Sequence, residues 1–128
     1  MSGSFLERTL ASTLPTFQQE WRELRRTYPD EAPPSADDFL GHLVAHVHHS
    51  LAEGRVAEVK RLFLAVERLL VDADPILQEL LETGLLARLA DECRESSVDP
   101  ALILPHLGPK SRVAWNRAQR ASQDETGS

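Results

Sequence analysis

The chain has 128 residues, of which 41% are hydrophobic and 27% charged, and its formal net charge is -6. This length suits one domain with a single core. The acidic balance argues against nucleic-acid binding, because phosphate contacts need lysine and arginine. Cys93 is the only cysteine, which excludes an internal disulfide and favours a reducing compartment. The sequence shows neither a signal peptide nor about 20 consecutive apolar residues, so we expect a soluble, cytoplasmic protein.

Apolar residues recur at helical spacing along most of the chain. This spacing predicts a short helix over residues 5–14 and a second helix that begins at Pro15, because proline is tolerated in the first helical turn. After a proline-rich loop, Ser35 and Asp38 form the pattern of a capping box. A third helix is therefore expected to begin there and to end at Gly54, since glycine commonly follows the last helical turn.

The fourth expected helix, at about residues 55–71, has the widest apolar face of the chain. A helix with such a face belongs at the centre of a bundle. We expect Phe63 and Leu70 on this face to pack against an aromatic stripe of the second helix, which contains Phe17 and Trp21.

Asp74 and Pro75 form the pattern of an N-cap followed by proline, which predicts the start of a fifth helix. Beyond Gly84, the apolar residues of this helix point roughly opposite to those before it, if every turn is α-helical. Either a kink at Gly84 or a break into two helices would reconcile the two faces.

Asp99 and Pro100 repeat the cap-and-proline pattern, which predicts a short helix through residue 104. A last helix is expected from residue 110 to about 119, with Val113 and Trp115 toward the core. The predicted fold is thus all-α, an irregular bundle of six to seven short helices, with stacked antiparallel helix pairs as an alternative. Residues 1–120 would form the single domain and residues 121–128 a disordered C-terminal tail.

Histidines are concentrated on the third expected helix, where His42, His46 and His49 share one side. Two histidines four residues apart can share a metal ion, so these three are candidate ligands. Leu43 stands where the zinc-protease motif has its glutamate. The alternative is that they are histidines of the protein surface or of an interface. We predict that the protein binds no cofactor.

Two further side chains have structural rather than catalytic interpretations. Glu67 lies at the edge of the wide apolar face and is expected to be half-buried and hydrogen-bonded to a neighbouring helix terminus. Cys93 lies on an apolar face and is expected to pack as a small hydrophobe. Since the chain also has no phosphate-binding glycine loop, serine-hydrolase motif or cysteine pair, we predict that it is not an enzyme.

Charge is distributed unevenly. Residues 72–99 contain eight acidic residues against two arginines, whereas residues 110–120 contain four basic residues and no acid. A surface of one sign can steer a partner of the opposite sign. The alternative is a solvated helix exterior, with the two regions attracting each other. The candidate partner-binding residues are Glu79, Glu82, Asp91, Glu92 and Glu95.

Several segments resemble a family of small, uncharacterised, helical bacterial proteins. They are Phe63–Leu70, Gly84–Leu86 with Leu89, Leu14-Pro15-x-Phe17 with Trp21, and the motif Leu107-Gly108-Pro109-x-Ser111-x-x-x-Trp115. Members of this type look like the immunity proteins or antitoxins of bacterial competition systems. The resemblance implies an acidic, cytoplasmic protein that binds and neutralises a basic toxin domain, without contacts to nucleic acid or membrane. The alternatives are a metal-binding sensor or enzyme that uses the histidine-rich helix, and a homodimeric structural protein.

Overall fold

The computed structural model describes the backbone of residues 2–96 and 98–127, and the side chains of residues 6–96, 98–99 and 101–120. Every regular element in this part of the chain is helical, so the predicted all-α class is confirmed. In chain order the elements are α1 (Ser2–Ala11), α2 (Pro15–Arg25), α3 (Ala36–Ala52), α4 (Val56–Val71), α5 (Pro75–Glu79), the π-helix η1 (Leu80–Ala87), α6 (Arg88–Ser96), the 3-10 turns η2 (Pro100–Leu102) and η3 (Leu104–His106), and α7 (Pro109–Gly127).

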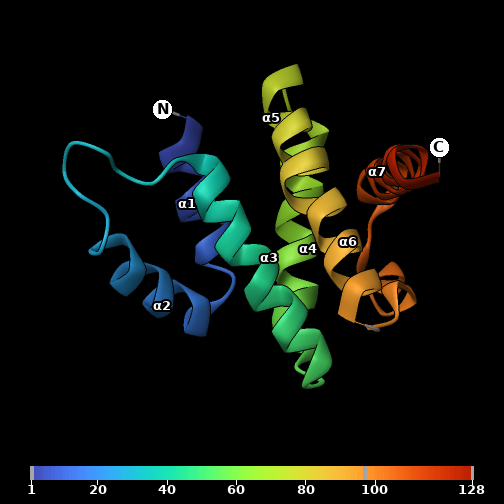
Figure 1. The fold of residues 1–128 in the computed structure, drawn as a ribbon, viewed down its shortest axis with the longest axis horizontal. Coiled ribbons are helices and arrows are strands. Elements are labelled where there is room, and N and C mark those ends of the chain that lie inside the picture. Colours follow the sequence, from blue (N-terminus) through green and yellow to red (C-terminus); the bar gives the residue numbers. More distant parts are fainter. Residues whose placement is uncertain (1, 97, 128) are drawn as a thin grey trace.

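The helices form an irregular bundle with the two ends of the chain on opposite sides (Figure 1). Helix α1 contacts α2, α3 and α4, while α7 contacts α4, η1 and α6. The segments α5, η1 and α6 follow one another without a gap, and η1 and α6 pack against α3 and α7. Among the described helices, none has the length and apolar character that crossing a membrane requires.

The predicted helix boundaries are confirmed by side-chain caps. The Ser35 hydroxyl accepts from the Asp38 amide at 3.1 Å, and Asp38 Oδ2 accepts from the Ser35 amide at 2.9 Å. These backbone and side-chain hydrogen bonds with Ser35 lower the pKa of Asp38. Helix α3 ends before Gly54, whose φ of 77° is readily adopted by glycine alone. Asp74 Oδ1 accepts from the Leu77 amide at 2.8 Å and so caps α5.

The aromatic core lies between α2 and α3. The ring of Phe39 is 5.8 Å from that of Phe17 and 5.2 Å from that of Trp21. Phe63 is fully buried, as predicted, but Leu70 is only half-buried. The helices that contact α2 most are α1 and α3 rather than α4, so the predicted packing of Phe63 and Leu70 on the aromatic stripe is not confirmed.

The change of apolar face near Gly84 falls within the π-helix η1, which separates α5 from α6, while the predicted kink at Gly84 stays a prediction. A π-helix closes each turn with one more residue than an α-helix, so its apolar face rotates while the helix continues. Leu81, Leu85 and Leu86 are buried along η1, which contacts both α3 and α7. The centre of the bundle thus includes η1 as well as α4.

The C-terminal part differs from the prediction in three places. The short helix expected after Pro100 is replaced by the two 3-10 turns. Trp115 is buried, as predicted, but Val113 is 52% exposed, because residues two apart on an α-helix point in different directions. Helix α7 continues to Gly127 where a disordered tail was predicted for residues 121–128, whose side chains and last residue lie outside the described part.

Candidate functional site

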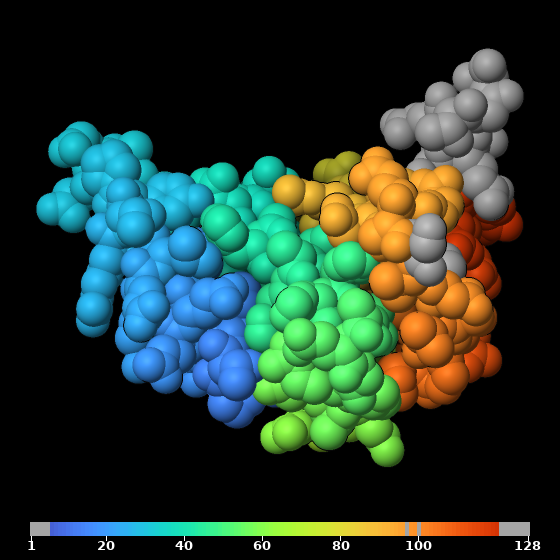
Figure 2. Space-filling model, turned by 60° about the horizontal axis from the view of Figure 1, so that its bottom comes forward, coloured from blue at the N-terminus to red at the C-terminus, as the bar shows by residue number. Residues whose placement is uncertain are grey.

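The predicted partner-binding residues lie along the continuous segment from α5 to α6. Glu79 ends α5, Glu82 lies in η1, and the other three lie in α6. Figure 2 shows the yellow and orange surface of η1 and α6 between the green surface of α3 and the red surface of α7. We call Glu79, Glu82, Asp91, Glu92 and Glu95 together the acidic surface.

At its α5 end the acidic surface is hollowed. Glu79 and Glu82 line a shallow hollow of about 330 Å³ together with Pro75, Gln78 and Thr83. Glu79 is exposed, and within the described residues it forms no ion pair. Of the two carboxylates in this lining, Glu82 is mostly buried and pairs with Arg117, so the exposed negative charge of the hollow is that of Glu79.

Part of the negative charge is neutralised within the molecule. Glu82 Oε2 lies 3.2 Å from Arg117 of α7, and Asp91 pairs with Arg94 one turn later. The basic C-terminal segment and the acidic segment thus attract each other at one point, one of the two possibilities that the sequence left open. Over the described residues Glu79, Glu92 and Glu95 have no ion pair.

The three candidate metal ligands have separate surroundings. The ring of His42 lies 5.6 Å from the ring of Trp21, His46 is buried against Phe17, and His49 Nε2 pairs with Glu53 at 3.0 Å. In the described part of the chain, no group of three or more histidine, cysteine or acidic side chains could hold a metal ion. The three histidines lie on one side of α3 by spacing, but they do not form one metal site.

A buried polar cluster at the junction of α2, α3 and α4 was not predicted. His46 Nε2 lies 3.6 Å from Glu58 Oε2, and Thr16 Oγ1 donates to Glu58 Oε1 at 3.0 Å. Neither His46 Nε2, Glu58 Oε2 nor the Ser50 hydroxyl has a hydrogen-bond partner among the described residues. Ser50 is fully buried as well. No short sequence pattern links His46 to Glu58, because the two residues lie on different helices.

Glu67 anchors α4 to the start of α7. Its carboxylate accepts from the amides of Lys110 at 3.0 Å and Ser111 at 2.9 Å, and from the Ser111 hydroxyl at 2.9 Å. Burial alone raises the pKa of Glu67, but the hydrogen bonds from Ser111 and Lys110 lower it below its ordinary value of 4.5. A Cβ on Gly108 would lie 2.5 Å from Glu67 Cδ, so the glycine leaves room for the carboxylate. The predicted bond to a helix terminus is confirmed.

Cys93 is buried, as predicted. Burial, reinforced by the negative charges of Glu92 and Asp99, raises the pKa of its thiol to about 11. Because the thiolate is the nucleophilic form, this cysteine is inert near neutral pH.

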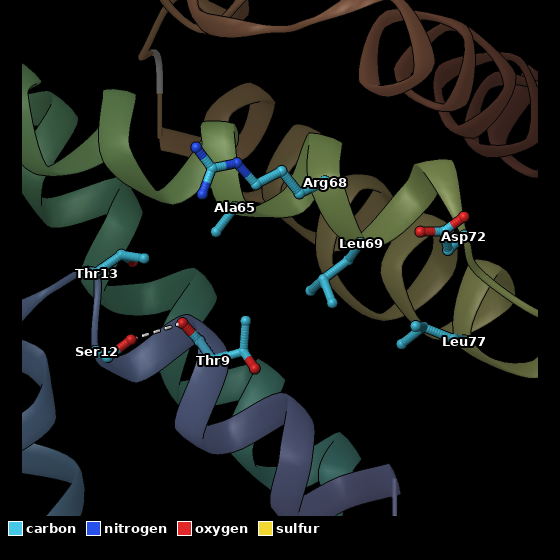
Figure 3. Close-up of a pocket in the computed structure, with 8 residues that line it drawn as sticks. All are labelled: Thr9, Ser12, Thr13, Ala65, Arg68, Leu69, Asp72 and Leu77. Carbon is cyan, nitrogen blue, oxygen red and sulfur yellow. Dashed lines mark hydrogen bonds between the residues drawn. The ribbon is translucent and has the colours of Figure 1, made fainter.

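A larger groove, lined by α1, α4 and the start of α5, has a volume of about 670 Å³. Figure 3 shows Ala65 and Leu69 of α4 pointing across it toward Thr9 of α1 and toward Thr13, which follows α1. No sequence pattern predicted this groove, because its width depends on how far apart α1 and α4 pack.

The described residues form a small all-α domain with a hollowed acidic surface and a groove between α1 and α4. The chain belongs to the family described as a domain of unknown function, DUF7674, which matches residues 7–122. A comparison with curated proteins and one with solved structures found no match.

Proposed function

We propose that this protein acts in the cytoplasm as an immunity protein or antitoxin that binds a basic bacterial toxin and blocks its active surface. The observation that carries this proposal is the acidic hollow, where the exposed carboxylate of Glu79 has no ion-pair partner among the described residues. The helical and turn motifs resemble a family of small, uncharacterised helical bacterial proteins whose members look like immunity proteins, and this resemblance supports the proposal.

The charge of the acidic surface suits the rapid capture of a toxin. Unpaired carboxylates on a protein with a net charge of -6 attract a basic partner over distances of about one Debye length, roughly 8 Å at physiological salt. The hollow then offers a place where a lysine or arginine of the partner can lie against Glu79. Within the molecule itself, the half-exposed Arg117 pairs with Glu82 in the way that we propose for a basic side chain of the partner and Glu79.

A metal-dependent sensor or enzyme built on the histidine-rich helix is the less favoured function. His46 is buried against Phe17, whereas His49 is exposed and pairs with Glu53. Two side chains with such different surroundings do not offer lone pairs to one ion.

The test is co-expression of the protein with the product of each neighbouring gene in a heterologous host. If one product arrests growth, the native protein should restore growth, and Glu79→Lys/Glu95→Lys should restore it less. Glu20→Lys/Glu23→Lys on α2 is the matched control, because it alters net charge equally at exposed positions of another helix. Binding of the purified pair should also slow as salt is raised.

Two outcomes would contradict the proposal at different levels. If no growth-arresting neighbour is neutralised, the immunity function is wrong. If the native protein and both double variants neutralise a toxin equally well, the immunity function stands but the acidic surface is not the contact.

A further inference from the structure

The groove between α1, α4 and α5 has the shape of a binding site for part of another protein. Its volume of about 670 Å³ is within the range of roughly 300–1,000 Å³ that is usual for ligand sites. Its floor contains Ala65, Leu69 and Leu77, while Thr9 and Thr13 form the opposite wall. The walls are helices, so an apolar side chain can enter between them without disturbing any backbone hydrogen bond.

Apolar side chains are also exposed on the helices that border this groove. Leu64 and Val71 of α4 are 53% and 59% exposed, and Ile76 of α5 is 70% exposed. Each is adjacent in sequence to a residue of the groove or one position away from it. Large apolar side chains grouped around a groove mark interaction surfaces more often than scattered single residues do.

The lining of this groove is not acidic overall, because it contains one arginine and one aspartate at opposite ends. Arg68 lines the groove, and Arg61 lies one helical turn before Ala65 on the same side of α4. Both arginines are exposed, and neither forms an ion pair with another described residue. Asp72 at the other end is the single acid of the lining, so the end near Arg61 and Arg68 is the cationic one.

We propose that this groove binds an amphipathic helix of a partner protein, with apolar side chains on the groove floor and carboxylates against Arg61 and Arg68. Recognition of this kind places an apolar stripe in a hydrophobic groove. An extended peptide is the less suitable occupant, because the described part of the chain has no strand to which it could add. The partner helix proposed for the groove is acidic, whereas the toxin proposed for the acidic surface is basic. The inference about the groove therefore does not depend on the toxin proposal.

The experiment uses three synthetic peptides with the same helical length. One has a leucine stripe flanked by glutamates, the second has the same stripe flanked by lysines, and the third has the composition of the first in scrambled order. Each is titrated into the isotope-labelled full chain and followed by amide chemical shifts. The acidic amphipathic peptide should bind three- to tenfold more tightly than the basic one, since two exposed ion pairs contribute modestly. The shifts should centre on Thr9, Thr13, Ala65 and Leu69.

A charge exchange makes the test specific. Arg61→Glu/Arg68→Glu should reverse the preference, so that the lysine peptide binds more tightly than the glutamate peptide. Arg22→Glu/Arg26→Glu on α2 is the matched control and should leave the preference unchanged, because these exposed arginines lie outside the groove. Thermal melts would verify that both variants fold.

The proposal is overturned by any of four results. The first two are the absence of saturable binding of the acidic amphipathic peptide up to about 1 mM, and binding of that peptide no tighter than that of the scrambled peptide. The other two are an unchanged preference in Arg61→Glu/Arg68→Glu, and chemical shift changes confined to the acidic surface.

Discussion

Removing the Glu67 carboxylate should destabilise the fold at the contact between α4 and α7. Glu67→Ala would delete one acceptor group that receives three hydrogen bonds, two of them from Ser111, which is fully buried. Loss of an N-terminal cap costs about 0.5–2 kcal/mol, and leaving a buried donor unsatisfied costs about 1–3 kcal/mol. Since these two costs overlap, we expect a loss of about 2 kcal/mol. For a chain of this length that lowers Tm by roughly 5–10 °C.

The pH dependence provides a second measurement of the same contact. Because the folded-state pKa of Glu67 is lowered from 4.5, its stabilisation is present above the unfolded-state value and is lost as pH falls through the folded-state value. The Tm difference between the native protein and Glu67→Gln should therefore be constant near neutral pH. It should shrink as pH falls below about 4.5. Differential scanning calorimetry at several pH values would measure it.

Gly108 offers a matched double-mutant cycle. Gly108→Ala would place a Cβ 2.5 Å from Glu67 Cδ and so displace the carboxylate. It should be destabilising in the native background and much less so in Glu67→Ala, where the displaced group is missing. A Glu67→Ala variant that melts within about 1 °C of the native protein, or additive effects of the two substitutions, would refute this account.

Three further predictions concern the core. Phe63→Ala should cost about 3–5 kcal/mol in urea unfolding, because Phe63 is fully buried; an unchanged midpoint would contradict its placement in the core. Gly84→Ala should cost about 1–3 kcal/mol, because its Cβ would lie 2.8 Å from Leu40 Cδ1 in a filled core; a neutral effect would mean that η1 packs less closely on α3. Cys93, with its pKa raised to about 11, should resist a thiol reagent at pH 8 until urea unfolds the chain; rapid labelling of the native protein would show that it is accessible.

The predictions that the structure confirms rest on short sequence patterns. Ser35, Asp38 and Asp74 each satisfy amides within three residues of themselves, so the pattern that produces the cap is contained in a short stretch. Gly54 and Pro15 act through their own backbone in the same way. All-α structure followed from spacing alone, because apolar residues at intervals of three and four fit one helical face.

Contacts between residues that lie far apart in the sequence were predicted less well. His46 and Glu58 meet only because α3 and α4 pack together, and the helical wheel of α3 alone put His46 on the same side as His49. Leu70 and Val113 belong to apolar patterns, but the neighbouring helices do not cover them completely. Periodicity identifies a face and not the element that covers it.

The leucines of η1 are shared between two neighbouring helices. The helical rod from Pro75 to Ser96 contacts α3 through η1 and α6, and it contacts α7 chiefly through η1. Neither neighbour can separate without exposing leucines that the rod shares with the other. Amide hydrogen exchange should therefore find the rod opening as a single cooperative unit, with η1 and the rod-facing turns of α3 and α7 exchanging at a common rate.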